Sequence, residues 1–147
     1  MKQVSEGLPA RPEPPLVLAI SECLLGTEVR YDGSGAKISF PHRMLSELFE
    51  YRGICPEVAI GMGVPREPIR LADIDGVIRA VEVGDPAGDF TKPLRHYGER
   101  VALELGDVAG YVFMNGSPSC GLHGVKVYPY QLSKLSGAPD RSGRGIH

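Results

Sequence analysis

The segment that decides the fold is 16-LVLAISECLLG-26, in which a short apolar run leads directly to a cysteine. The run LVLAIS (residues 16–21) is continuous and apolar, which is typical of a strand buried on both faces of a parallel sheet. Cys23 falls just past the end of that strand. The chain repeats this arrangement further on, where GYVFMN (110–115) is followed by GSPSCG (116–121). Two cysteines are therefore expected at the carboxyl ends of strands.

Four other segments have a pattern that predicts a regular element. Apolar residues recur at helical spacing in two of them, PHRMLSELFEYR (41–52) and KPLRHYGERVALELG (92–106). The other two are expected strands, VIRAVEV (77–83) after an Asp-Gly turn signal, as one arm of a hairpin, and VKVYPY (125–130). Strands that alternate with helices predict an α/β fold, a single domain whose mainly parallel, Rossmann-like sheet is flanked by helices. Ligand sites in such sheets open at the carboxyl ends of strands.

Length and composition indicate one soluble domain. The chain has 147 residues, 42% hydrophobic and 23% charged, and no apolar stretch that approaches the length of a membrane span. Residues 1–15 are rich in proline and charge, which predicts a mobile tail before a domain at 16–147. The start lacks a signal-peptide run, so we expect a cytoplasmic protein that is a monomer or a small homo-oligomer. A net charge of −2 gives no broad basic surface, so long nucleic acid is not an expected partner.

The three cysteines, Cys23, Cys55 and Cys120, lie in turn-prone surroundings: SECLLG, CPE and SPSCG. Small residues and prolines allow the backbone to approach a bulky cofactor and to offer amides to it. The spacings of 32 and 65 residues match no compact zinc pattern. Three soft thiolates suit an iron-sulfur cluster and leave one iron of a 4Fe-4S cube open. Three unrelated buried thiols remain the alternative.

The order of four motifs carries a family resemblance. SECLLG, VRYDG, CPEVAIGMGVPREPIRL and SPSCG follow one another as in the thiouracil desulfidase family, which the chain resembles from about residue 16 to residue 147. The resemblance implies a 4Fe-4S cluster ligated by Cys23, Cys55 and Cys120, with the fourth iron free to bind the sulfur of the substrate. It also implies a stand-alone catalytic unit, without the second domain of fused relatives, that removes sulfur from a thiolated pyrimidine.

The implied reaction is non-redox: water adds to the polarised C=S carbon, and the products are the oxo-pyrimidine and hydrogen sulfide. It requires a base and a hydrogen-bond donor near the reacting carbon. The resemblance supports an acidic residue and a serine, for which we take Glu57 and Ser117. Ser119 is the rival of Ser117, and its hydroxyl has an alternative role as a donor to the cluster. For an isolated Glu57, capping of a helix after Pro56 is the alternative.

Charged residues suggest how a substrate would bind. Arg30 and Asp32 in VRYDG form either a buried structural ion pair or a contact with the substrate. Arg66 and Arg70 are candidate phosphate ligands, because guanidinium groups match phosphate oxygens, and Lys37 and Lys126 are weaker ones. These cations make 4-thiouridine monophosphate a candidate substrate, although the choice among free base, nucleoside and nucleotide stays open. No phosphate-binding glycine loop is present.

Three other functions remain alternatives. A cluster-bearing redox or sensor module would bind a ligand at the open iron without turnover. A zinc-binding interaction module would need a histidine such as His42 or His123 as the fourth ligand. A sulfur-inserting enzyme would run the chemistry in the opposite direction and would require ATP. Metal analysis, turnover and ATP dependence separate these alternatives.

Overall fold

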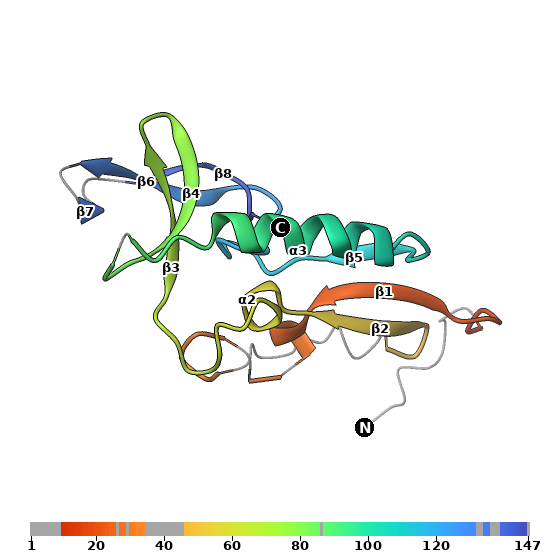
Figure 1. Ribbon diagram of the computed structural model, residues 1–147. Coiled ribbons are helices and arrows are strands. Elements are labelled where there is room, and N and C mark those ends of the chain that lie inside the picture. Colours follow the sequence, from red (N-terminus) through yellow and green to blue (C-terminus); the bar gives the residue numbers. More distant parts are fainter. Residues whose placement is uncertain are drawn as a thin grey trace, which may run out of the picture.

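The computed structural model describes residues 10–25, 27–28, 30–34, 46–85, 87–131, 134–135 and 139–146, and the structural statements below concern these residues. They form two sheets and a long helix (Figure 1). In the first sheet, β1 (Leu16–Ser21) lies between β2 (Phe49–Ile54) and β5 (Gly110–Val112), and both neighbours run parallel to it. The carboxyl ends of all three strands therefore meet at one edge.

The second sheet is mixed. Its core pair is parallel, β3 (Ile69–Ile74) with β6 (Val125–Gln131). Three antiparallel strands complete it: β4 (Val77–Glu82) beside β3, and β7 (Lys134–Leu135) and β8 (Asp140–Gly143) beside β6. The turn between β3 and β4 has positive φ at both central residues, Asp75 and Gly76, as tight hairpins require.

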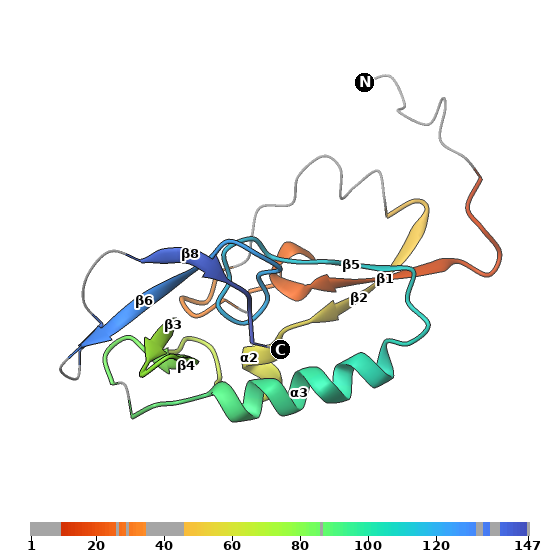
Figure 2. The ribbon, with the colours of Figure 1, turned by 90° about the horizontal axis from the view of Figure 1, so that it is seen from above.

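Helix α3 (Thr91–Glu104) connects the cores of the two sheets. Its buried positions, Thr91, Leu94, Gly98 and Val101, recur at helical spacing and form one face. Leu94 packs in the apolar core of the second sheet, whereas Val101 packs with Ala19 and Ile54 of the first. Figure 2 shows α3 running along one side of the molecule, from beside β3 and β4 to the connection that leads into β5. Because α3 packs against both sheets, it fixes how the carboxyl ends of the first sheet's strands lie relative to the start of β3. The candidate site lies between these two parts.

The remaining helices are short and lie at the edge of the first sheet. The 3-10 helix η1 (Glu22–Leu25) follows β1 directly, and α2 (Pro56–Ala59) follows β2 after one residue. Pro56 occupies the first helical position, where its missing N–H has no cost. No helix in the described part of the chain is long and apolar enough to cross a membrane.

The predicted α/β class is confirmed, with its parallel sheet, the strand at 16–21, the hairpin and the helix near 92–106. The Rossmann-like order stays a prediction, and the boundary at residue 15 stays one too. The helix expected at 41–52 is wrong where the structure describes it, because residues 46–48 form a turn and β2 begins at Phe49; residues 41–45 lie outside the described part. Pairing of β2 with β1 along all six residues outweighs the helical spacing of its apolar side chains.

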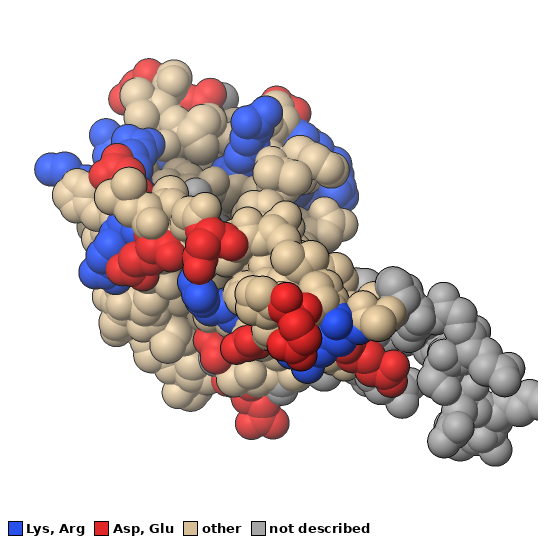
Figure 3. All heavy atoms as spheres, turned by 90° about the vertical axis from the view of Figure 1, so that its right-hand side faces the viewer, with Lys and Arg blue, Asp and Glu red and all other residues tan. Residues whose placement is uncertain are grey.

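The surface carries both signs of charge. Figure 3 shows one face of the molecule on which Asp and Glu side chains are interspersed with Lys and Arg. Lys126, one of the weaker phosphate candidates, is exposed, and Lys37 lies outside the described residues.

Candidate active site

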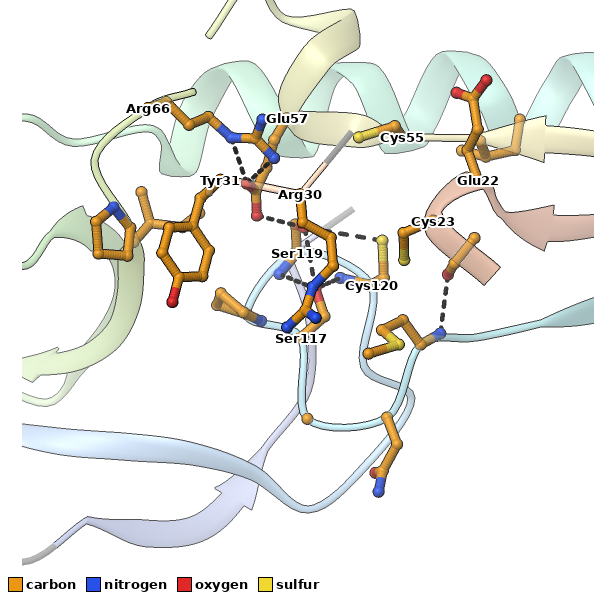
Figure 4. Close-up of a pocket in the computed structure, with 18 of the residues that line it drawn as sticks. Glu22, Cys23, Arg30, Tyr31, Cys55, Glu57, Arg66, Ser117, Ser119 and Cys120 are labelled. Atoms are coloured by element: carbon orange, nitrogen blue, oxygen red, sulfur yellow. Dashed lines mark hydrogen bonds and ion pairs between the residues drawn. The ribbon is translucent and has the colours of Figure 1, made fainter. Parts of the chain in front are cut away.

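A pocket of about 190 Å³ opens where the carboxyl ends of the three parallel strands meet the start of β3. Four stretches of chain line it: Ser21–Cys23 with Arg30 and Tyr31; Ile54, Cys55 and Glu57; Arg66 with Pro68–Arg70; and Met114–Cys120. Figure 4 shows the side chains of these stretches facing one another.

All three cysteines line this pocket, and none forms a disulfide. Cys23 lies in η1 after β1, Cys55 lies between β2 and α2, and Cys120 lies in the loop after β5. Burial raises the pKa of each thiol, that of Cys120 to about 11, and the nearby Cys55 raises the pKa of the other two further. Binding a metal as thiolates therefore requires the loss of three protons.

The donor set suits an iron-sulfur cluster better than a single ion. In the part of the chain that the structure describes, no three His, Cys, Asp or Glu side chains converge closely enough to hold one metal ion. A cluster contacts its thiolates through different iron atoms, so its ligands do not need to meet at one point. His123 is exposed and does not line the pocket, which removes it as a fourth zinc ligand, and His42 lies outside the described residues.

Glu57 is held by two partners at the wall of the pocket. Arg66 donates from Nε and Nη2 to Oε2 of Glu57 at 2.8 and 2.7 Å, and its Nη1 donates to the carbonyl of Gly63 at 2.8 Å. Ser119 Oγ donates to Oε1 of Glu57 at 2.9 Å. The side chains of Arg66 and Glu57 are only 6% and 12% exposed. Because the carboxylate bonds to these partners, the structure gives no support to the alternative that Glu57 caps α2.

The two serines of SPSCG have different surroundings. Ser117 Oγ accepts hydrogen bonds from the backbone N–H groups of Cys120 at 3.0 Å and Ser119 at 3.3 Å. Ser119 is 2% exposed, and its Oγ lies 3.2 Å from Ser117 Oγ and 3.7 Å from the sulfur of Cys120. Both serines line the pocket, so the structure brings the two rivals together.

The remaining predicted residues divide into two groups. Arg30 and Arg70 line the pocket with Arg66, and Figure 4 shows Arg30 extending across it. Asp32 does not line it: its side chain is exposed, and its Oδ1 accepts hydrogen bonds from the backbone and hydroxyl of Ser34 at 2.9 and 2.6 Å. The alternative of a buried ion pair between Arg30 and Asp32 is therefore wrong, because Asp32 lies at the surface and its local turn supplies its partners.

Comparison with known proteins now identifies the family. A family model described as 2-thiouracil desulfurase matches residues 18–147. The chain belongs to the 2-thiouracil desulfurase family. Among solved structures, it is similar to a 4Fe-4S-dependent thiouracil desulfidase, TudS, with a TM-score of 0.63 and 27% sequence identity over 89% of this chain and 81% of that chain. No curated protein matches the chain.

The residues matched by the 2-thiouracil desulfurase model include all four motifs that suggested the family. The match begins at Leu18, so it leaves out the first two residues of the strand before SECLLG. The family resemblance is thus confirmed, and the fold is shared with an iron-sulfur enzyme. The roles of individual residues in this chain are not decided by these comparisons, and they are taken up below as proposals.

Among the polar residues of the pocket that the sequence did not single out are Glu22, Tyr31 and Asn115 and, with the clearest role, Ser21. It ends β1, is 1% exposed, and its Oγ accepts a hydrogen bond from the N–H of Met114 at 2.8 Å. It also bonds to Cys120, which lowers the pKa of that thiol against the larger effect of burial. The signal was present in the sequence, since a serine that closes an apolar strand just before a cysteine needs a buried polar partner.

Proposed function

We propose that this protein removes sulfur from a thiolated pyrimidine, by hydrolysis and without net redox chemistry, with a 4Fe-4S cluster held by Cys23, Cys55 and Cys120. The observation that carries the proposal is the gathering of these three cysteines and the Glu57–Ser119–Ser117 group in one pocket. Family membership and the likeness to a 4Fe-4S-dependent thiouracil desulfidase support the same reaction.

A cluster bound by three thiolates would supply an open iron, a Lewis acid that polarises the C=S bond and takes up the sulfur. The protein side chains have to provide the rest. Glu57 is the base that receives a proton from water, and Ser117 is the hydroxyl group nearest to that water. Arg66 holds Glu57 in place through two hydrogen bonds to one oxygen. The water oxygen then adds to the ring carbon.

The balance of the reaction requires no other reactant. One water replaces one sulfur, so the thiocarbonyl becomes a carbonyl and the sulfur leaves with the two hydrogens of the water as hydrogen sulfide. The carbon keeps its oxidation state throughout. Neither a reductant nor ATP is therefore expected to be needed.

The cations of the pocket favour a substrate that carries a phosphate, such as 4-thiouridine monophosphate. Arg66 already binds Glu57 and Gly63, so we assign phosphate binding to the two other arginines of the pocket, Arg30 and Arg70. Arg70 is exposed, with its guanidinium 5.7 Å from the centre of the Tyr128 ring, a position compatible with a phosphate at the rim.

The test uses the protein reconstituted with iron and sulfide without oxygen, in water enriched in oxygen-18. 2-Thiouracil, 4-thiouracil, 4-thiouridine and 4-thiouridine monophosphate are offered in parallel without ATP or reductant, and the products are analysed by mass spectrometry. We expect one oxygen-18 per product molecule and the highest kcat/KM for the monophosphate. An intact cluster that converts none of the four would favour the sensor alternative. Equal kcat/KM for the nucleoside and the monophosphate would contradict the proposed contact between the pocket arginines and a substrate phosphate.

A further inference from the structure

The side chain of Ser119 connects Ser117 to Glu57 by hydrogen bonds within the pocket wall. Ser117 Oγ lies 3.2 Å from Ser119 Oγ, and Ser119 Oγ lies 2.9 Å from Oε1 of Glu57. Arg66 closes the far end of the chain at Oε2. Figure 4 shows the dashed contacts running from Arg66 through Glu57 to the loop of Ser117 and Ser119. Two segments that are 60 residues apart in sequence thus share one hydrogen-bonded chain.

The chemistry of the groups fixes the direction of these bonds. An ionised carboxylate only accepts, so the single hydroxyl proton of Ser119 points to Glu57. The oxygen of Ser119 is then the acceptor in its contact with Ser117, and the proton of Ser117 points to Ser119. The oxygen of Ser117 accepts in turn from the N–H groups of Cys120 and Ser119. Each hydroxyl therefore donates toward Glu57.

The pocket-facing end of the chain is suited to carry negative charge. Two backbone N–H groups point at Ser117 Oγ, the arrangement that stabilises an oxyanion. At the other end, Glu57 already accepts three hydrogen bonds, two from Arg66 and one from Ser119. Its side chain is only 12% exposed. Of these donors, only the Ser119 hydroxyl can give its proton to Glu57, because the guanidinium of Arg66 stays protonated.

We propose that Ser119 is a positioning residue that relays a proton from Ser117 to Glu57, so that Ser117 is the group in contact with the attacking water. The relay rests on the proposed desulfidase function. The proton of Ser119 passes to Oε1 of Glu57 and the proton of Ser117 passes to Ser119, which leaves a lone pair on Ser117 Oγ to take a proton from the water. Three O–H bonds break and three form, which leaves hydroxide, two neutral serines and a neutral carboxyl group. No electrons are transferred, and the proton returns along the same path when the sulfur leaves.

In this relay Ser117 and Ser119 have different roles, so they are no longer alternatives for one role. If Ser119 were only a second donor to the sulfur of Cys120, its proton would point to that atom, which lies at 3.7 Å. The carboxylate of Glu57 is a closer acceptor, at 2.9 Å. Ser119 is also only 2% exposed, and its hydroxyl lies between Ser117 and Glu57, so it acts through these two neighbours.

The experiment compares single turnovers of Ser119→Ala and Ser119→Thr with the unaltered enzyme, each with its cluster content measured. Ser119→Ala should keep the cluster and the KM but lose about a hundredfold in rate, the low end of the contribution of a positioned acid or base. Ser119→Thr keeps the hydroxyl and should recover most of the rate. Ser142→Ala is the matched control, because it removes a serine-to-carboxylate hydrogen bond, to Asp140, outside the pocket.

Two further readouts do not depend on the rate of a variant. In mixtures of light and heavy water, the rate of the unaltered enzyme should fall along a curve, because several protons move together. The infrared band of the Glu57 carboxylate, assigned by its loss in Glu57→Gln, should shift in Ser119→Ala because one hydrogen bond is gone.

The relay is overturned by any of four results: full activity in Ser119→Ala, no rescue by Ser119→Thr, a straight line in the heavy-water series, or an unshifted carboxylate band. Loss of the cluster in both variants would also overturn it, since it would assign Ser119 to the support of Cys120. An unaltered enzyme that converts no thiopyrimidine would instead refute the proposed function, and the infrared band would still decide whether the hydrogen bond exists.

Discussion

Glu57 joins two segments of the pocket wall through the three hydrogen bonds that its carboxylate accepts. Arg66 lies before β3 and Ser119 lies in the loop after β5, and both donate hydrogen bonds to this carboxylate. Its position two residues after Cys55 was visible in the sequence, but its partners were not. Arg66 was interpreted as a phosphate ligand, because nothing in a single sequence shows that an arginine nine positions away folds back onto a glutamate.

Replacement of Glu57 by glutamine tests its role as the base. The amide has almost the same shape but cannot take up a proton, so turnover should fall at least about a hundredfold while the iron content stays unchanged. The measurement is turnover beside iron analysis, with the exposed Glu104→Gln as control. Full activity in Glu57→Gln would remove the residue from the mechanism.

Arg66 should stabilise the folded protein as well as hold Glu57 in position. Removing one partner of a buried ion pair leaves an uncompensated charge, so Arg66→Met should cost about 3–5 kcal/mol of the free energy of unfolding. The double variant Glu57→Gln with Arg66→Met removes both charges and should recover part of that loss. Urea unfolding followed by circular dichroism measures both.

The control is Arg100→Met, which breaks an exposed pair with Glu104 and a contact with the Tyr97 ring. It should change the free energy of unfolding by less than about 1 kcal/mol. If Arg66→Met were as mild as this control, the pair with Glu57 would not be a stabilising element of the pocket wall.

At the scale of elements, the sequence pattern predicted the helices and strands whose tertiary contacts favour the same conformation as the pattern does. The strand at 16–21 is central and apolar, and α3 presents one regular buried face, so both were predictable. β2 was not, since its burial alternates only weakly and its conformation depends on pairing with β1. The short strands β7 and β8 carry almost no pattern, because they exist through their pairing with β6.

The start of α3 offers a test at this scale. Asp89 Oδ1 accepts from the N–H of Thr91 at 2.9 Å, and its Oδ2 accepts from Arg79 of β4 at 2.9 Å. The Thr91 hydroxyl accepts in turn from the N–H of Ala80 at 2.8 Å. Burial acts to raise the pKa of Asp89, but the bonds from Thr91 and Arg79 outweigh it, and the pKa lies below its ordinary value of 3.8.

Asp89→Asn should therefore lower the free energy of unfolding at pH 7 by about 1 kcal/mol, the scale of a lost capping contact. A lowered pKa in the folded state stabilises above the unfolded value and is lost as the pH falls through the folded one. The difference from the unaltered protein should thus shrink as the pH falls below 3.8. Paired thermal unfolding scans measure it, and a difference independent of pH would contradict the role of the charge.

At the scale of the whole molecule, the carboxyl-terminal residues support the loop of Cys120. Gly145 donates its N–H to the carbonyl of Gly121 at 2.7 Å, and Ile146 donates to the carbonyl of Pro118 at 3.1 Å. Figures 1 and 2 both place this end of the chain beside α3. In the sequence this segment, RSGRGIH (141–147), is glycine-rich and polar and predicts no such support, since the close approach that needs glycine depends on the tertiary fold.

Gly145→Ala should disturb the cluster loop. A Cβ at this position would lie 2.5 Å from the carbonyl oxygen of Ser119 and 2.7 Å from the nitrogen of Cys120, and both are backbone atoms that cannot turn aside. We expect iron content and turnover to fall together. Gly84→Ala is the matched control, because its Cβ would meet nothing within 4 Å. Normal iron content in Gly145→Ala would show that the loop does not depend on this contact.

We have proposed that three cysteines of one pocket hold a cluster with which the protein removes sulfur without redox chemistry. The most direct test measures sulfide and oxo-pyrimidine released from 4-thiouridine monophosphate by the reconstituted protein, without oxygen, reductant or ATP, beside Cys120→Ala. We expect one sulfide per product at about four irons per chain, and loss of iron and turnover together in the variant. Stable, active cluster in Cys120→Ala, or turnover that requires a reductant, would contradict it.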